Sequence, residues 1–272
     1  MIPAPFDYAR AGSVQEAISL LGADPDAKVL AGGHSLLPAM RLRIARPSML
    51  VDIGRLADLS YVREDGDRIT IGALTRHHDV ANAEALQQLC PIVAHAAWQI
   101  GDPQVRHMGT IGGSVAHGDP AGDLPSVLLA LDAEFVAQGP TGPRTVAATG
   151  FFTSLFETAL GPDEVLTEIR VPKANAGWSF MKFQRRAQDW AVVGVSAVRA
   201  NGGVHVGLTN MGLTPLRATG VEEAVGRGAD PASAAARADE GTAPPDDAFG
   251  SAEYRRQLVK VLVRRALEEA LP

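Results

Sequence analysis

Two glycine pairs, each with a hydroxyl residue beside it, are the residues of this 272-residue chain best suited to bind a ligand. One lies in AGGHSLLP, from Ala31 to Pro38, and the other in TIGGSVAHGDPAGD, from Thr110 to Asp123. Glycine adopts positive φ readily and has no Cβ to block a ligand, so successive backbone N–H groups can form a concave anion site. A helix that follows such a turn adds positive potential, which suits phosphate.

Two turns of this kind fit a ligand with two phosphates, such as a dinucleotide cofactor. One glycine pair at a strand end usually makes only a turn, so the prediction depends on both pairs acting together. The hydroxyls of Ser35 and Thr110 can add side-chain donors. Neither stretch has the G-x-G-x-x-G spacing of the Rossmann fingerprint, which argues against the usual NAD-binding fold.

Strands and helices must bring the two pairs together. The first pair is predicted to end a short strand, Lys28–Gly33, and to lead into a short helix that starts at Ser35. The second pair is expected to follow a strand or an extended segment, ahead of a helix over Asp123–Asp132 with Pro125 in its first turn. Further elements are predicted as a capped helix at 13–23, strands at 49–53, 68–73 and 164–172, and two helices between 80 and 100 separated at Pro91.

The pattern changes after residue 174, within KANAG. Three strand-like runs, GWSFMKFQRRAQ, AVVGVSAVRA and NGGVHVGLTNMG, predict an antiparallel meander, and SAEYRRQLVKVLVRRALEEAL predicts a long amphipathic helix. The fold class expected is therefore α+β. We expect two domains, residues 1–174 and residues 175–272.

Composition limits the classes of function. The chain is 46% hydrophobic and has a formal net charge of −6, which does not favour nucleic-acid binding. It has no apolar run of membrane-spanning length, and its N-terminus does not resemble a secretory signal. The single cysteine, Cys90, excludes an internal disulfide and a cysteine-bound iron–sulfur cluster within this chain. A cytoplasmic protein is expected, and Cys90 is expected to be a small buried residue.

Four segments carry a resemblance that covers nearly the whole chain. They are AGGHSLLPAMRLRIARPSMLVDIGRL, DPQVRHMGTIGGSVAHGDPAGDLPSVLLAL, FMKFQRRAQDWAVV and LTNMGLTPLRA. Together they resemble the FAD-binding medium subunits of molybdenum hydroxylases, the family that includes the medium subunit of carbon monoxide dehydrogenase and the FAD module of xanthine dehydrogenase. The resemblance implies a two-part α/β FAD-binding domain followed by a small domain of three antiparallel strands and helices.

The resemblance also implies the residues that hold non-covalent FAD. Asp123 would accept hydrogen bonds from ribityl or ribose hydroxyls, Leu166 would make an apolar contact, and Lys182 would lie near the cofactor; Ile100 is a weaker match. Ser114 is shorter than the Asn or Asp of many relatives, so its contact would be longer or made through water. The two sides of the pyrophosphate would be held by Ala31, Gly32, Gly33, His34, Ser35 and Leu36, and by Thr110, Ile111, Gly112, Gly113 and Ser114.

The function implied is electron transfer within a three-part oxidoreductase. A large partner subunit would hold the molybdenum cofactor, a small one two 2Fe–2S clusters, and FAD would pass electrons to an acceptor such as a quinone or O2. No catalytic acid or base and no metal ligand is assigned to this chain. Two alternatives stay open: a free-standing flavin reductase or oxidase, and a degenerate assembly subunit without FAD.

Several other residues have simpler interpretations. The neighbouring histidines His77 and His78 lack the spacing of a metal pair and are expected on the surface. The three tryptophans, Trp98, Trp178 and Trp190, are expected to be core or interface anchors rather than flavin-stacking residues.

Overall fold

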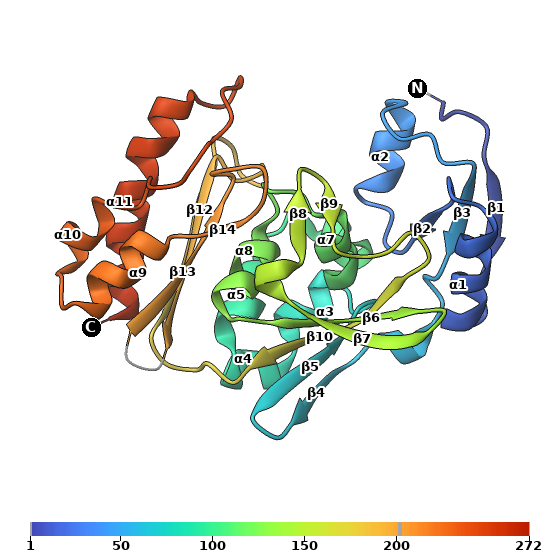
Figure 1. The fold of residues 1–272 in the computed structure, drawn as a ribbon, viewed down its shortest axis with the longest axis horizontal. Helices are drawn as coiled ribbons and strands as arrows, with labels where there is room; N and C mark the ends of the chain where they lie inside the picture. The colour runs from blue at the N-terminus through green and yellow to red at the C-terminus, as the bar shows by residue number, and fades with distance from the viewer. Residues whose placement is uncertain (1, 201–202, 272) are drawn as a thin grey trace.

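The computed structural model describes residues 2–200 and 203–271. Met1, Asn201, Gly202 and Pro272 lie outside the described residues, and with them the first two residues of the third C-terminal strand run. Three sheets and a two-stranded ribbon form the framework. The sheets follow one another in chain order across the molecule, from the N-terminal strands in blue to the C-terminal strands in orange (Figure 1).

The first sheet is small and parallel, with the strand order β1-β3-β2. Its apolar positions pack against α1, whose N-terminus is capped by the Ser13 side chain, which accepts a hydrogen bond from Glu16 N at 3.1 Å. The elements are β1 (Asp7–Arg10), α1 (Val14–Ala23), β2 (Lys28–Leu30), α2 (Leu36–Arg41), β3 (Met49–Asp52) and the 3₁₀ turn η1 (Ala57–Leu59).

The second sheet is antiparallel, with the strand order β4-β5-β10-β6-β7. Its strands are β4 (Val62–Asp65), β5 (Arg68–Gly72), β6 (Glu134–Gly139), β7 (Gly142–Ala147) and β10 (Val165–Pro172). Its helices are α3 (His77–Asn82), α4 (Glu84–Leu89), α5 (Pro91–Trp98), α6 (Pro103–Met108), α7 (Ile111–His117) and α8 (Asp123–Ala130). The 3₁₀ turn η2 (Ala148–Gly150) and the ribbon β8 (Phe152–Ser154) and β9 (Glu157–Thr158) complete this region.

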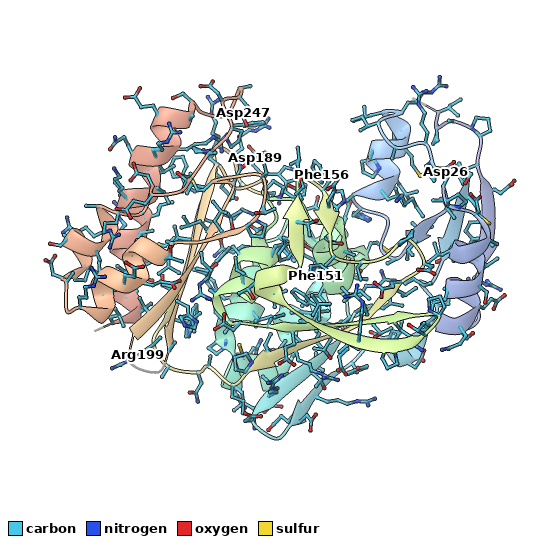
Figure 2. The ribbon with its side chains drawn as sticks, in the orientation of Figure 1. Asp26, Phe151, Phe156, Asp189, Arg199 and Asp247 are labelled. Atoms are coloured by element: carbon cyan, nitrogen blue, oxygen red, sulfur yellow. The ribbon has the colours of Figure 1, made fainter. Side chains whose placement is uncertain are left out.

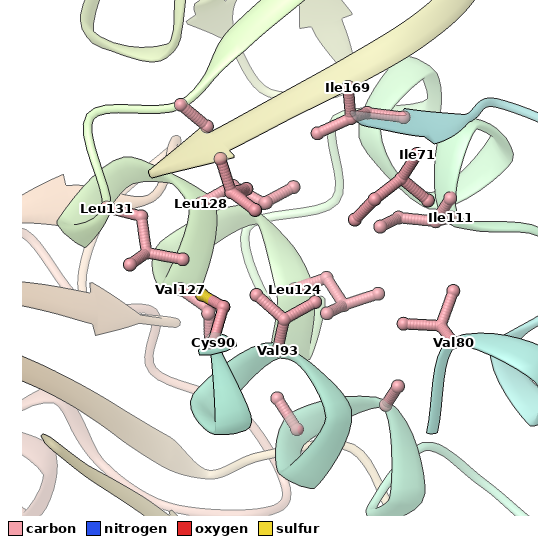
Figure 3. Packing of buried hydrophobic residues seen from close by; sticks show 14 of the residues in the cluster. Ile71, Val80, Cys90, Val93, Ile111, Leu124, Val127, Leu128, Leu131 and Ile169 are labelled. Carbon is pink, nitrogen blue, oxygen red and sulfur yellow. The ribbon is translucent and has the colours of Figure 1, made fainter. Parts of the chain in front are cut away.

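The main hydrophobic core lies between the second sheet and these helices. Ile71 and Ile169 from neighbouring strands lie opposite Val93 and Leu124 from α5 and α8 (Figure 3). Each aliphatic side chain buried in this way contributes about 1.5–3 kcal/mol to folding. Cys90 is fully buried here, as predicted, and burial raises the pKa of its thiol to about 12, so the thiol stays protonated.

The third sheet contains the three predicted antiparallel strands and a short fourth strand that the sequence did not reveal. The strands are β11 (Trp178–Phe183), β12 (Val193–Ala200), β13 (Gly203–Thr209) and β14 (Leu216–Arg217), and the helices are α9 (Thr219–Gly226), α10 (Pro231–Ala235) and α11 (Ala252–Ala270). These helices share a core with the strands, while α8 contacts β12 and β13. At that contact the Ser126 hydroxyl lies 2.6 Å from Thr209 Oγ1 and 3.2 Å from Ser196 Oγ.

The α+β class predicted from the sequence is confirmed. The strands of the first two sheets end by Pro172, and those of the third sheet begin at Trp178. The division into domains at residue 174 stays a prediction. Within residues 2–200 and 203–271, no helix combines the length and the apolar character that spanning a membrane requires.

Candidate functional site

A cavity of about 860 Å³ lies where the three parts of the fold meet. Its wall includes Gly32 and Gly33 from the N-terminal part, Thr110 and Asp123 from the middle part, and Lys182 from the third sheet. In Figure 1, α2 and α7 stand on opposite sides of the region between the blue and green parts of the chain. The volume is at the upper end of the range for small-molecule sites, which suits a ligand as large as a dinucleotide.

The first glycine stretch lies against the residues that directly precede the second. We refer to Ala31–Ser35 as the first glycine loop and to Thr110–Ser114 as the second glycine loop. A Cβ at Gly32 would lie 2.2 Å from the Met108 carbonyl oxygen and 2.8 Å from Gly109 Cα, so only glycine allows this approach. Two segments far apart in the sequence therefore meet at the same wall of the cavity.

The first glycine loop presents free backbone donors. It connects the end of β2 to α2, and Gly33 adopts φ +74°, a left-handed conformation that favours glycine. The N–H groups of Gly32, Gly33, His34 and Ser35 donate to no acceptor among the described residues. Four successive unpaired donors beside a cavity can bind an anion such as a phosphate.

The second glycine loop is different, and the prediction that it offers a row of free donors was wrong. The extended residues Gly109 and Thr110 connect it to helix α6, and Gly112 and Gly113 lie within α7. Its N–H groups already donate within the protein. Ile111 N donates to Thr75 O at 3.0 Å and Gly112 N to Ala73 O at 2.9 Å. Gly113 N donates to Thr110 Oγ1 at 3.1 Å and Ser114 N to Thr110 O at 3.0 Å. The second loop therefore has no row of free donors for an anion, because carbonyl groups just after β5 and the Thr110 cap accept hydrogen bonds from these donors.

Three of the expected site residues do not line the cavity. A Cβ at Gly112 would lie 2.5 Å from Ala73 Cβ, so this glycine serves the packing of α7 against the chain that follows β5. Ile111 is fully buried beside Ile71 in the main core (Figure 3), and Leu166 is 5% exposed in the same cluster. The expectation that these residues face the cofactor is corrected for the side chains of Ile111 and Leu166, which lie in the main core, and for Gly112, which lies against Ala73.

The other expected residues do line the cavity, and Ile100 lines it too. They are Ala31, Gly32, Gly33, His34, Ser35, Leu36, Thr110, Gly113, Ser114, Asp123 and Lys182. Thr110 Oγ1 accepts a hydrogen bond from Gly113 N, which leaves the hydroxyl hydrogen free to donate.

Asp123 and Lys182 form a buried ion pair in the wall of the cavity. Lys182 Nζ lies 2.8 Å from Asp123 Oδ2 and also donates to Gln99 O at 3.1 Å, and the two side chains are 2% and 6% exposed. Asp123 Oδ1 is buried and has no partner among the described residues. Burial raises the pKa of Asp123 to about 6, and Lys182 opposes that shift. An unpartnered carboxylate oxygen at this position can accept a hydrogen bond from a ligand hydroxyl.

His77 was wrongly expected on the surface. It is 5% exposed, lines the cavity at the start of α3, and donates its backbone N–H to Gly109 O at 3.0 Å. His78 instead stacks on His107, with ring centroids 4.0 Å apart. Nothing in the spacing of the two histidines could have revealed the difference, because it depends on how α3 meets the second glycine loop.

The tryptophans do not lie in the core as a group. Trp190 is 60% exposed and lines the cavity together with Asp189 and Phe156, both of which Figure 2 labels. Trp98 is 56% exposed under the Arg106 guanidinium, and only Trp178 packs against the main core. Trp98 and Trp190 are therefore not core anchors, and their role as interface anchors stays a prediction.

Comparison with known proteins adds independent findings. The family described as "FAD binding domain in molybdopterin dehydrogenase" matches residues 4–174, and "CO dehydrogenase flavoprotein C-terminal domain" matches residues 178–270. The chain is 42% identical to the carbon monoxide dehydrogenase medium chain of Hydrogenophaga pseudoflava, over 99% of this chain and 98% of the relative. It is 37% identical to the glyceraldehyde dehydrogenase medium chain of Sulfolobus acidocaldarius, over 99% of each chain.

A solved structure gives the same result. The structure of the Hydrogenophaga pseudoflava carbon monoxide dehydrogenase that lacks the Mo-pyranopterin moiety of its cofactor superposes with a TM-score of 0.94 at 43% identity, covering 99% of this chain and 98% of that chain. The likeness extends over both parts of the fold.

Proposed function

Because the chain belongs to the family of FAD-binding medium subunits of molybdenum hydroxylases, we propose that it carries FAD in its cavity and transfers electrons within a larger oxidoreductase. One observation carries the proposal: the free N–H groups of the first glycine loop and the unpartnered oxygen of Asp123 line the same cavity. FAD has a diphosphate that can accept hydrogen bonds from the N–H groups, and ribityl and ribose hydroxyls that can donate to the Asp123 oxygen.

The described residues fit this cofactor. In our proposal, the N–H groups of Gly32, Gly33, His34 and Ser35 bind the pyrophosphate, and the Thr110 hydroxyl and Ser114 lie against it from the second glycine loop. Asp123 Oδ1 accepts a hydrogen bond from a hydroxyl of the cofactor. It does not lie next to the phosphates, because two negative charges repel each other.

Lys182 has a positioning role in this proposal. Its ammonium group holds Asp123 from the third sheet, so the carboxylate keeps its orientation only when α8 and β11 are packed together. The cofactor site is therefore complete only in the fully folded chain. Neither residue is assigned as a catalytic acid or base.

The proposal extends to the partner subunits and to the path of the electrons. A large subunit with the molybdenum cofactor and a small subunit with 2Fe–2S clusters would complete the enzyme. When bound, FAD would supply the redox chemistry that takes electrons from the clusters and gives them to an acceptor such as a quinone or O2. Relatives named for carbon monoxide and for glyceraldehyde match this chain at nearly full length, so this chain does not determine the substrate.

The proposal is tested by the flavin content of the purified protein, together with any subunits that co-purify. We expect a flavin absorption spectrum and about one FAD per chain on acid release. A protein that stays colourless with added FAD would contradict the proposal and favour a degenerate assembly subunit. Rapid NADH oxidation by the chain without partners would instead favour a free-standing flavin enzyme.

Asp123→Asn tests the cavity directly. We expect FAD affinity to fall by about tenfold or more, because hydrogen bonds to a charged acceptor are worth about 1.5–3 kcal/mol. Fluorescence titration with FAD measures the change. The matched control is Asp58→Asn, an exposed aspartate without a hydrogen-bond partner among the described residues, which should bind FAD as the wild type does. Equal affinities of the two variants would exclude Asp123 from the site.

A further inference from the structure

His77 is a buried titratable group that the proposed site does not yet use. Its side chain lines the cavity at 5% exposure, and its Nδ1 is buried without a hydrogen-bond partner among the described residues. Buried polar side-chain atoms normally have a partner, so an orphaned ring nitrogen at a ligand cavity requires an explanation.

The ring is fixed against the residue that precedes the second glycine loop. The backbone around His77 pairs with this segment: Arg76 bridges to Thr110, and His77 N donates to Gly109 O at 3.0 Å. A Cβ at Gly109 would lie 2.8 Å from His77 Cδ2 and 3.1 Å from its Nε2, so the imidazole packs directly on this glycine. Gly109 in turn contacts Gly32 of the first loop.

The side chains that act electrostatically on His77 are all basic. His34 from the first glycine loop, Arg106 from α6 and Arg76 at the start of α3 each disfavour a second positive charge there. Burial, together with these groups, lowers the pKa of His77 to about 4, so the ring is neutral near pH 7 in the ligand-free chain. Among the described residues, no carboxylate raises the pKa of this ring.

We propose that His77 is a further cofactor-binding residue, which takes up a proton from solvent when the diphosphate of FAD lies between the two glycine loops. This inference rests on the proposed function. The diphosphate carries two negative charges, and its arrival reverses the sign of the local field. Protonation of the His77 ring then costs little free energy, because the resulting imidazolium ion lies near an anion. His77 would thus contribute a charge to the bound state while remaining neutral in the empty site.

Proton uptake makes FAD binding depend on pH with a definite sign. A group whose pKa rises on binding strengthens binding as the pH falls toward the pKa of the bound state. The other titratable or charged residues that line the cavity are His34, His117, Lys28, Lys182, Asp119, Asp123, Glu157, Glu164 and Asp189. Asp123 acts in the opposite direction, because a ligand hydroxyl that donates to its carboxylate favours proton release. The contribution of His77 must therefore be measured as a difference between variants.

The experiment measures the dissociation constant of FAD between about pH 5.5 and pH 7.5, for the protein together with any co-purifying subunits. We compare the wild type with His77→Gln, which keeps a polar side chain of similar reach but does not titrate. Over this range the wild-type affinity should rise about tenfold relative to that of the variant as the pH falls. An unchanged ratio would overturn the inference.

The matched control is His95→Gln. His95 is another histidine whose pKa burial lowers, but it does not line the cavity. This variant should keep the wild-type pH dependence, and a loss equal to that of His77→Gln would also overturn the inference. Absence of FAD binding by the wild type at every pH would instead reject the proposed function, so the two failures are distinguishable.

A second measurement does not require the variant to fold. Nitrogen-15 labelling of the histidines in the wild type reports the protonation state of each ring. Addition of FAD at about pH 6 should convert one neutral imidazole to the protonated form. If no histidine changes state when FAD saturates the protein, the inference is wrong.

Discussion

The two glycine loops share a sequence pattern and have opposite physical roles. In the first loop, Gly33 takes a left-handed conformation and four successive N–H groups remain free beside the cavity. In the second loop, Gly112 and Gly113 are helical and every N–H group from Ile111 to Ser114 is bonded within the protein. The first loop therefore keeps the donors that our proposal assigns to the pyrophosphate, whereas the second loop uses its donors to pack closely.

This difference shows that a glycine pair has two separate uses. One is conformational freedom, which Gly33 needs for its positive φ. The other is the absence of a Cβ, which Gly32 and Gly112 need because backbone or side-chain atoms lie within 2.5 Å of the position that a Cβ would occupy. Substitutions in the two loops should therefore have different consequences, and three predictions test this, in addition to the variants of Asp123 and His77.

The largest effect is expected for Gly112→Val. The new side chain would meet Ala73 Cβ at 2.5 Å and Ala73 O at 2.6 Å, so α7 must move away from the chain that follows β5. We expect a loss of about 3 kcal/mol in the free energy of unfolding, measured in urea. Gly22→Ala is the control, since no atom lies within 4 Å of its added Cβ. Normal stability combined with lost FAD binding would mean that the second loop is a ligand loop after all.

A smaller effect on stability, but a specific one on binding, is expected for Gly33→Ala. An alanine at φ +74° costs about 1–2 kcal/mol in the folded state, which the loop can avoid by changing its conformation. The row of N–H groups would then be lost, and FAD affinity should fall by about tenfold. Titration with FAD and urea unfolding measure both quantities.

Gly66→Ala is the control that separates the cost of a positive φ at alanine from a loss of FAD affinity. Gly66 also has a positive φ, of +59°, and its added Cβ would meet no atom within 4 Å. It lies in the turn between β4 and β5, away from the cavity lining. Its variant should lose similar stability while FAD affinity stays unchanged. Equal losses of affinity in the two variants would contradict the role of the first loop.

The smallest effects are expected at the two hydroxyl residues that precede helices. Thr110 caps α7 through its side chain, so Thr110→Ala should cost about 1 kcal/mol of unfolding free energy. Ser35 makes no side-chain cap to α2, so Ser35→Ala should change stability by less than about 0.5 kcal/mol. Thermal unfolding measures both, and Thr110→Ser should retain most of the stability. The reverse ranking would show that Ser35, and not Thr110, is the structural hydroxyl.

Much of the fold followed from local patterns. The helix that begins after Ser13 was predicted from its cap and periodicity, and the helix that begins at Pro91 from the proline break, because these signals are local. The segment before Pro91 was predicted as one helix and forms two, α3 and α4. Helix α6 was missed, although Asp102 and Pro103 form an N-terminal capping signal that could have indicated it. Strand β14 has only two residues, which is too short for a periodic pattern.

The sequence by itself determined the types of residue available: glycines without a Cβ, a carboxylate and a lysine in motifs that identify the family. Only the tertiary structure decided which of these groups are free to bind. The carbonyl groups of Ala73 and Thr75, far from the second loop in sequence, accept hydrogen bonds from its N–H groups, while no acceptor in the described part of the chain reaches those of the first loop. Likewise, Lys182 leaves one oxygen of Asp123 without a partner. The physical reason is that a hydrogen bond depends on a distant partner, which no local pattern contains.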